Sequence, residues 1–333
     1  MTQPDAGQDR TDVADDDHAA DHENAYAGLL VNDAHWAFGT DFTDPLAGVD
    51  TTVPDGIDPG LLAAYCLMLG DDALVMSHRL SEWCSCAPDL EEDIALANIA
   101  LDLLGQARLL LARAAAADPS VVPSLPEESP VSAEDALAFF REDRQFRNVR
   151  MVEMPHGDFA ETIVRILLFS CWRLALLQRL ADSRDSVLAA VAAKGIKEVT
   201  YHRDFAAQWF VTLADGTDVS RGRLLDGMAM VWPLWGEVFD SHPVEVAVAR
   251  AGIGVDPAMT HDDVEQVLDH ILVAAGLDRP EVLELAGLRA STTDDPAAVQ
   301  PGLTGRDGLH TEALSRMLTE MQVVARAHPI GRW

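Results

Sequence analysis

The sequence predicts an all-α protein, a bundle of four long antiparallel helices with additional C-terminal helices. Four long apolar stretches have the spacing of amphipathic or buried helices, and short breaks join them into two hairpins. No window alternates apolar and polar residues as a half-buried strand does. Of the 333 residues, 48% are hydrophobic, so the chain is long enough and apolar enough to bury a sizeable core.

The first part of the chain has a different composition from the rest. Residues 1–24 are rich in Asp and Ala and contain one basic residue, Arg10, which predicts a disordered acidic tail. Residues 25–59 place large apolar side chains among Gly, Pro and Asp, so we expect an extended arm lying on its own core or on a partner. The helical domain then spans residues 60–333.

The first hairpin joins helices that we expect over residues 58–84 and 89–117. Pro88 interrupts the helical hydrogen bonds between them, and Asp89 is a suitable N-cap for the second helix. That second helix is apolar on nearly every face, so it is expected to lie between neighbours. A single polar row interrupts it, formed by Asn98, Asp102 and Gln106.

The remaining elements are predicted from caps and breaks. Trp232 and Pro233 lie inside one helical stretch, where the proline predicts a kink. Thr260 and Asp263 form a capping signal at the start of another. The helices expected are short ones opening at Ser132 and over 260–275, and longer ones over 158–181, 185–213, 219–240 and 308–327.

Charge and cysteine content exclude several classes of protein. The net charge of −31 argues against binding nucleic acid or an anionic membrane. The N-terminus lacks a signal-peptide pattern and charges are expected to limit each apolar helix to less than a membrane span, so we expect a soluble cytoplasmic protein. The cysteines lack the spacing of a disulfide framework or zinc site and are expected to be reduced packing residues: Cys66, Cys84, Cys86 and Cys171.

Two long-helix hairpins are also the framework of the ferritin-like carboxylate bundle. Its di-iron centre needs a carboxylate from each of two helices and Glu-x-x-His from each of the other two. The single Glu-x-x-His of this chain, Glu153–His156, contains a proline and precedes a glycine, which predicts a loop. Two Asp-x-x-His pairs, Asp15–His18 and Asp307–His310, fall outside the bundle helices. Motifs for a serine hydrolase, a P-loop or dinucleotide binding are absent.

Several longer motifs carry a family resemblance. They include Leu69-Gly-Asp-Asp72, Arg79-Leu-Ser-Glu-Trp-Cys84, Ala87-Pro-Asp-Leu90, Leu101-Asp-Leu-Leu-Gly-Gln-Ala-Arg108, Glu142-Asp-Arg-Gln-Phe146 and Gly308-Leu-His-Thr-Glu312. On these motifs, residues 60–333 closely resemble the family of the C subunits of the ring-1,2-phenylacetyl-CoA epoxidase, a multicomponent bacterial oxygenase of aerobic phenylacetate breakdown. The resemblance implies a ferritin-like subunit that holds no iron and serves as structural partner of a di-iron catalytic subunit.

The resemblance also implies where the iron ligands of the catalytic paralogue would fall. Aligning the shared segments Ala87-Pro88 and Lys197-Glu198 assigns those places to Ala73, Leu103, Gln106, Ser170, Val199 and His202. Of these six, His202 alone retains a potential ligand. A hard, multiply charged iron pair needs several anionic oxygens, which these positions do not supply.

Four polar side chains near these positions are expected to form a buried hydrogen-bonded network in place of a metal: Asp102, Gln106, Glu198 and His202. A register one residue away would offer Asp72, Asp102 and Glu198 as ligands. That shift turns each side chain by about 100° around its helix. All three carboxylates would have to be aimed at the same metal site in spite of this rotation.

The function implied by the resemblance is that of a non-catalytic structural subunit without a cofactor of its own. Its partners would be the di-iron catalytic subunit and the other subunits of the epoxidase, while contact with the acyl-CoA stays open. Two alternatives also stay open, an active di-iron oxygenase and an independent helical binding protein. A docking face is expected from an exposed subset of the tryptophans, Trp83, Trp172, Trp209, Trp232, Trp235 and Trp333.

Overall fold

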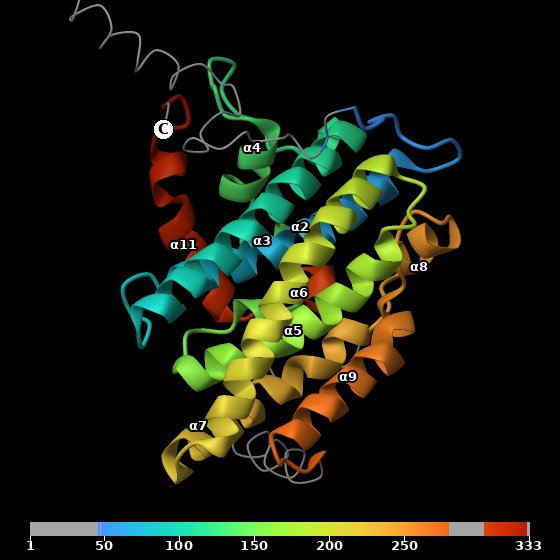
Figure 1. Cartoon of the computed structure of the whole chain (residues 1–333). Helices are drawn as coiled ribbons and strands as arrows, with labels where there is room; N and C mark the ends of the chain where they lie inside the picture. The colour runs from blue at the N-terminus through green and yellow to red at the C-terminus, as the bar shows by residue number, and fades with distance from the viewer. Residues whose placement is uncertain (1–45, 47, 280–302, 332–333) are drawn as a thin grey trace, which may run out of the picture. The chain divides into compact units, whose positions relative to one another are not determined.

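The computed structural model describes residues 46, 48–279 and 303–331, and its contacts divide the chain into two units at Ala47 and Gly48. Every element of regular structure in these described residues is helical, which confirms the all-α fold class (Figure 1). All of these elements belong to the second unit. The predicted tail 1–24 and most of the predicted arm lie outside the described residues.

Four long helices form the bundle: α2 (Pro59–Ser81), α3 (Leu90–Ala117), α5 (Phe159–Leu180) and α6 (Ser186–Asp215). Helix α2 packs along α3, and α5 packs along α6, so the two predicted hairpins are present (Figure 1). Contacts between α3 and α6 join the hairpins. The four helices begin and end within a few residues of the predicted positions.

Aspartate side chains define where these helices begin. Asp58, Asp89, Asp158 and Asp185 each accept a hydrogen bond from a backbone N–H in the first turn of the helix that follows. Such a bond satisfies one of the amide donors that a helix leaves unpaired at its start. Asp185 has a second role, because its buried carboxylate also forms an ion pair with Arg113 of α3.

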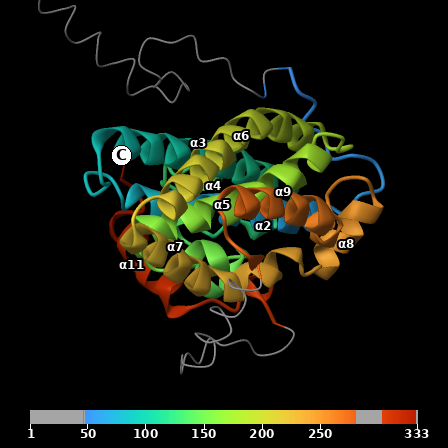
Figure 2. The ribbon, with the colours of Figure 1, turned by 60° about the horizontal axis from the view of Figure 1, so that its bottom comes forward.

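Shorter helices cover the bundle. Helix α4 (Ala133–Phe139) and helix α11 (Glu312–Ala327) contact each other, while α7 (Asp218–Val231) and α9 (His261–Ala274) pack against α5 (Figures 1 and 2). Helix α8 (Pro243–Arg250), which the sequence did not predict, packs against α2. Single turns of 3₁₀ helix connect them: η1 (Pro119–Val121), η2 (Asp143–Gln145), η3 (Arg150–Glu153), η5 (Pro257–Thr260) and η6 (Gly305–Asp307).

The helix predicted over residues 219–240 divides at its proline. Helix α7 ends at Val231, and the chain continues as the 3₁₀ helix η4 (Trp232–Phe239). Pro233 provides no N–H for the α-helical ladder, so the change of helix type falls where the kink was predicted.

One predicted helix cap and one predicted helix start are wrong. The Thr260 side chain does not cap α9, because its hydroxyl donates instead to the carbonyl oxygen of Pro257, 2.7 Å away. Helix α11 begins at Glu312 and not at Gly308, since Gly308 has a left-handed φ of 82° that ends the preceding turn.

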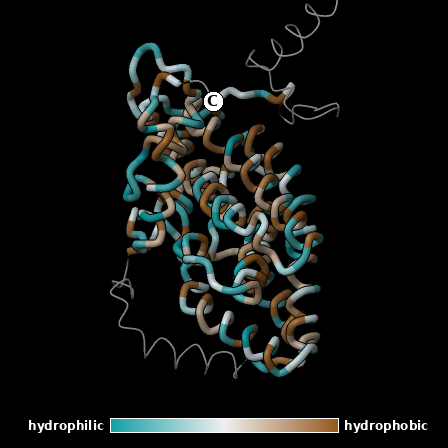
Figure 3. Tube along the Cα trace, turned by 90° about the vertical axis from the view of Figure 1, so that its left-hand side faces the viewer, coloured by the Kyte–Doolittle hydropathy of each residue, from teal (hydrophilic) through white to brown (hydrophobic). Residues whose placement is uncertain are grey.

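The apolar residues of α2 and α3 are distributed differently. Charged residues do interrupt both helices, Asp71 and Asp72 in α2 and Asp102 and Arg108 in α3. By length and composition both helices could nevertheless cross a membrane, so the expectation that charge limits them to less than a membrane span is wrong. The bundle buries 78% of the apolar window in α2 and 50% of that in α3. Figure 3 shows hydrophobic residues following the helices of the bundle. The prediction that this second helix lies between neighbours on every side is therefore wrong, because part of α3 faces solvent.

All four cysteines are free thiols. Cys66 and Cys171 are buried packing residues, and burial raises the pKa of the Cys171 thiol to about 12. Cys84 and Cys86 are exposed in the connection between α2 and α3, so the prediction that all four are packing residues is wrong for this pair.

Candidate functional site

The six positions that the resemblance assigns to iron ligands lie in the interior of the bundle. None of the six side chains belongs to a residue that is more than 2% exposed. All four long helices contribute, with Ala73 from α2, Leu103 and Gln106 from α3, Ser170 from α5, and Val199 and His202 from α6.

The three polar members of this set each bind a different protein group. The Ser170 hydroxyl donates to the carbonyl oxygen of Ile166 in its own helix, at 2.6 Å. The Gln106 amide Nε2 donates to Glu198 Oε2 at 3.1 Å, and His202 Nε2 lies 3.0 Å from Asp102 Oδ2. Each buried polar group is therefore satisfied within the protein.

The four residues of the expected network meet as two pairs, Gln106 with Glu198 and Asp102 with His202. Both pairs join α3 to α6. The inner ends, Gln106 and His202, are buried, but the Asp102 side chain is 36% exposed. The network therefore lies at the seam between the two helices and opens to the surface at its outer end.

From this seam a line of charged groups continues into the bundle. Lys194 Nζ lies 3.1 Å from Glu198 Oε1, and Glu198 accepts from Gln106 as described. On the inner side, Arg173 of α5 donates from Nη2 to Gln106 Oε1 at 3.4 Å. The guanidinium of Arg173 is fully buried, so a permanent positive charge lies beside one of the assigned ligand positions.

Asp72 of α2 continues this line toward the outer helices. Its Oδ2 is 4.0 Å from Arg173 Nη1 and 2.9 Å from Arg306 Nη2, and Arg306 Nε lies 3.6 Å from Glu245 of α8. Charges thus alternate in sign from Lys194 to Glu245. Alternation lets each buried ion face a neighbour of opposite sign, which offsets the free energy cost of removing it from water.

The two buried guanidinium groups keep their charge. Burial lowers the pKa of Arg173 to about 10, against the opposing effect of the Asp72 carboxylate, and this value is still well above neutral pH. Burial also acts to lower the pKa of Arg306, but the carboxylates of Asp72 and Glu245 outweigh it and raise the pKa above its ordinary value.

These interior residues do not fit a di-iron centre. Iron needs several anionic oxygens around it, and the six assigned positions supply an amide, a hydroxyl, an imidazole and alkyl groups. The fixed cation of Arg173, in contact with Gln106, would also repel a metal ion there. The described residues do bring three acidic groups together, but they are at the exposed start of α3, where such groups complement the helix dipole: Asp89, Glu91 and Glu92.

The sequence pairs that were rejected as ligands have separate partners. Glu153 ends η3 and His156 lies in the loop after it, where His156 Nε2 is 2.8 Å from Glu82 Oε2. Glu153 instead lies 2.9 Å from His310 Nδ1. The prediction that neither Glu153–His156 nor Asp307–His310 lies on a bundle helix is confirmed, and Asp15–His18 is outside the described residues.

Helix α3 presents an apolar face to solvent. At 100° per residue, four of its side chains fall within about 80° of one another around the helix. They are between 40% and 68% exposed: Leu90, Ile94, Leu101 and Leu104. On α6, which contacts α3, Tyr201 is 50% exposed and its ring stacks on that of Phe205. We call the four aliphatic residues with Tyr201 the α3 face.

The predicted tryptophan docking face is not present in the part of the chain that the structure describes. Trp172 and Trp235 are buried, and Trp83, Trp209 and Trp232 are each only partly exposed. Indole donors take part in the packing, since Trp83 Nε1 donates to Thr162 and Trp235 Nε1 to Glu265. Trp333 lies outside the described residues. Among the described residues, the large exposed apolar side chains are therefore mostly aliphatic, with Tyr201 as an aromatic exception.

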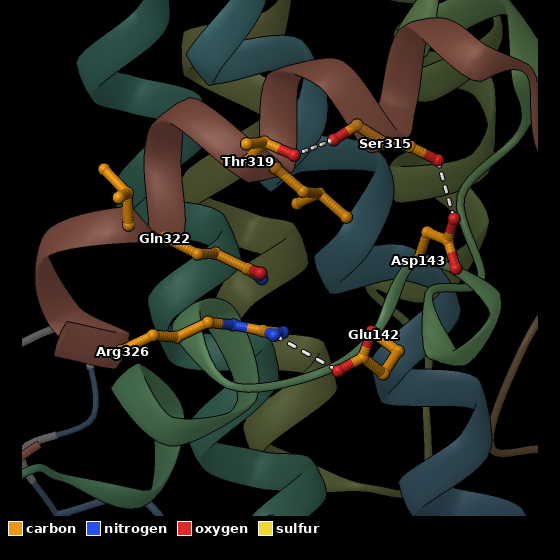
Figure 4. A pocket seen from close by; sticks show the side chains of 8 residues that line it. Glu142, Asp143, Ser315, Thr319, Gln322 and Arg326 are labelled. Carbon is orange, nitrogen blue, oxygen red and sulfur yellow. Dashed lines mark hydrogen bonds and ion pairs between the residues drawn. The ribbon is translucent and has the colours of Figure 1, made fainter.

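A shallow hollow of about 370 Å³ lies between α11 and the chain around η2 (Figure 4). Its polar side chains bind one another across the gap, Arg326 Nη1 to Glu142 Oε1 at 3.1 Å and Ser315 Oγ to Asp143 Oδ2 at 2.6 Å. These bonds attach α11 to the segment beneath it.

The sequence analysis missed Arg173 and Arg306 as interior residues, and it considered their shared partner Asp72 only as a ligand in the shifted register. The signal for Arg173 was present, because an arginine within the apolar helix Phe159–Leu180 must find a buried partner. Which carboxylate it meets depends on tertiary packing and has no local signal.

Bundle and interior together define a class: a ferritin-like helical protein whose assigned ligand positions lack a metal donor set. More particularly, the chain belongs to the phenylacetic acid catabolic protein family, whose family model matches residues 58–333. A curated relative from Escherichia coli (strain K12) is named as the C subunit of 1,2-phenylacetyl-CoA epoxidase. It is 42% identical over 272 residues, which cover 82% of this chain and 99% of the relative.

Proposed function

We propose that this chain is a structural, non-catalytic subunit of a 1,2-phenylacetyl-CoA epoxidase complex in the cytoplasm, acting in aerobic phenylacetate catabolism. In this proposal it carries no iron and binds the di-iron catalytic subunit, which it stabilises. The near full-length match to a relative named as the C subunit of that epoxidase supports membership of such a complex.

The observation that carries the non-catalytic role is the chemistry of the interior. A di-iron oxygenase needs carboxylates from all four long helices, and the buried residues at the corresponding positions contain none. The space beside Gln106 holds the guanidinium of Arg173. An interior of this kind supports a role in assembly and stability.

The α3 face supports a partner-binding role. Apolar side chains that remain exposed in one stripe along a long helix are typical of a surface that another protein covers. The partner's side of the contact is expected to be apolar too. A second copy of this chain is a poor occupant, because each copy has a net charge of −31.

Co-expression with the catalytic subunit tests this proposal. We expect the two chains to elute together in size-exclusion chromatography, and the catalytic subunit alone to be less soluble or less stable. Epoxidation of phenylacetyl-CoA by the reconstituted complex should require the iron of the catalytic subunit only. Separate elution of the two chains at micromolar concentration would contradict the proposal.

A further inference from the structure

Glu153 and His310 belong to two sequence pairs that have no role as metal ligands, and the fold brings them together. Glu153 is fully buried and the His310 side chain is 4% exposed. His310 Nδ1 lies 2.9 Å from Glu153 Oε2, and His310 Nε2 lies 3.0 Å from the carbonyl oxygen of Phe146. The imidazole thus joins the segment just before α11 to residues 146–153, which lie far away in the sequence.

Both ring nitrogens of His310 face an acceptor. A neutral imidazole has one N–H, so its other nitrogen would direct a lone pair at an oxygen that cannot donate. Glu153 also accepts from the Asn148 amide at 3.0 Å and from the backbone N–H of Thr311, so its oxygens behave as those of an ionised carboxylate. The geometry is satisfied by a doubly protonated His310 beside an ionised Glu153.

The charged groups around this pair come from α2, the chain around η2, and η3. They are Asp71, Arg79, Asp143, Arg147 and Glu153. Burial acts to lower the pKa of His310, but the Glu153 carboxylate outweighs it, with help from the Phe146 carbonyl and Asp71. The pKa of His310 is therefore raised above its ordinary value of 6.5.

His310 lies just before α11, and its protonation decides whether its contact with Glu153 is an ion pair. Two other anchors lie nearby: Arg306 pairs with Asp72, and Arg79 Nη2 donates to the carbonyl oxygen of Ala313 at 2.8 Å. Loss of a proton from His310 would leave the buried Glu153 carboxylate without its cation, a costly arrangement.

We propose that His310 and Glu153 form a proton-dependent latch that holds the start of α11 on the bundle and opens when His310 loses its proton. A group whose pKa is higher in the folded state than in the unfolded state stabilises the folded state. This stabilisation is complete below the unfolded pKa, about 6.5 for histidine, and is lost as pH rises through the folded pKa. The latch is therefore closed below about pH 6.5 and opens as pH rises through the folded pKa of His310, which lies above that value.

Two measurements on the full chain test the latch. The first is NMR of protein labelled with ¹⁵N-histidine, with the His310 signal assigned by its absence in H310Q. We expect this signal to keep the shifts of a doubly protonated ring as pH rises above about 6.5. A His310 ring that is already neutral at about pH 6 would overturn the proposal, and this result does not depend on how well a variant folds.

The second measurement is trypsin cleavage at Arg316 in α11, divided by cleavage at Arg223 in α7 to remove the protease's own pH dependence. The ratio should rise about tenfold for each unit by which the folded pKa of His310 exceeds 6.5. In H310Q it should be high at every pH. Equal pH profiles of this ratio in H310Q and wild type would overturn the proposal.

Discussion

Asp72 shows how charge is accommodated inside this bundle. Its carboxylate is fully buried and receives both Nη1 and Nη2 of Arg306, at 3.0 and 2.9 Å, while a backbone N–H at Val149 donates to it at 2.9 Å. A two-point contact of this kind between a guanidinium and a carboxylate is specific in geometry. It joins α2 to a segment more than 200 residues later in the chain.

Removing the guanidinium tests the importance of this pair. R306M should lower the free energy of unfolding by roughly 3–5 kcal/mol, because it leaves Asp72 as a buried charge with a weaker partner. Urea denaturation followed by circular dichroism gives this value.

The matched control is R316M, which removes an arginine at the surface. Arg316 forms an ion pair with Glu312, and their side chains are 73% and 79% exposed. Its effect should stay within about 0.5 kcal/mol. If both substitutions cost the same, the interior pair has no special role in stability.

At this scale the sequence predicted residue types better than partners. It singled out Asp102, Gln106, Glu198 and His202, and the structure brings these together as two pairs. It did not predict that Arg173 lies beside Gln106, because that contact depends on how the two hairpins pack together. Nor did it pair Glu153 with His310, since each was considered only with its neighbours in sequence.

Among the elements, α3 has two distinct sides. One side packs on α2 and provides Gln106 to the interior, while the other carries the exposed α3 face. The row Asn98, Asp102 and Gln106 passes from one side to the other, because residues four apart advance about 40° around the helix. Asn98 is exposed, Asp102 is partly exposed and Gln106 is buried, in agreement with this rotation.

Charge placed on the α3 face should separate the subunits without unfolding this one. We expect the double variant L101E/L104E to keep its melting temperature, because both side chains are already exposed, and to lose co-elution with the catalytic subunit. The measurement is size-exclusion chromatography of the co-expressed pair.

The control for this experiment is V273E on α9, where Val273 is 77% exposed and lies outside the α3 face. It should co-elute as the wild type does. Normal assembly by L101E/L104E would show that the partner binds elsewhere.

Helix ends could be predicted where the signal is local. Asp58, Asp89, Asp158 and Asp185 cap their helices through bonds to residues two or three positions away. The signal at Thr260 failed because a 3₁₀ turn before the helix uses the hydroxyl. The exposed side of α3 could not be predicted, since an apolar side chain covered by another helix and one left in solvent have the same sequence pattern.

At the scale of the whole molecule, the interior of the helix bundle is filled by apolar side chains and by ion-paired charged ones. Apolar periodicity and caps predicted its class and its four long helices, because both depend on short sequence separations. The covering layer was harder, since α8 depends on its contacts with α2. The ionic line from Lys194 to Glu245 joins that layer to the core.

The absence of a metal centre is the central claim about the whole molecule, and iron content tests it most directly. The chain should be purified without chelators from cells grown with excess iron, and analysed by mass spectrometry of its metals alongside the separately purified catalytic subunit. We predict well below one iron per chain for this protein and about two for the catalytic subunit. Two irons per chain here, retained through gel filtration, would contradict the account.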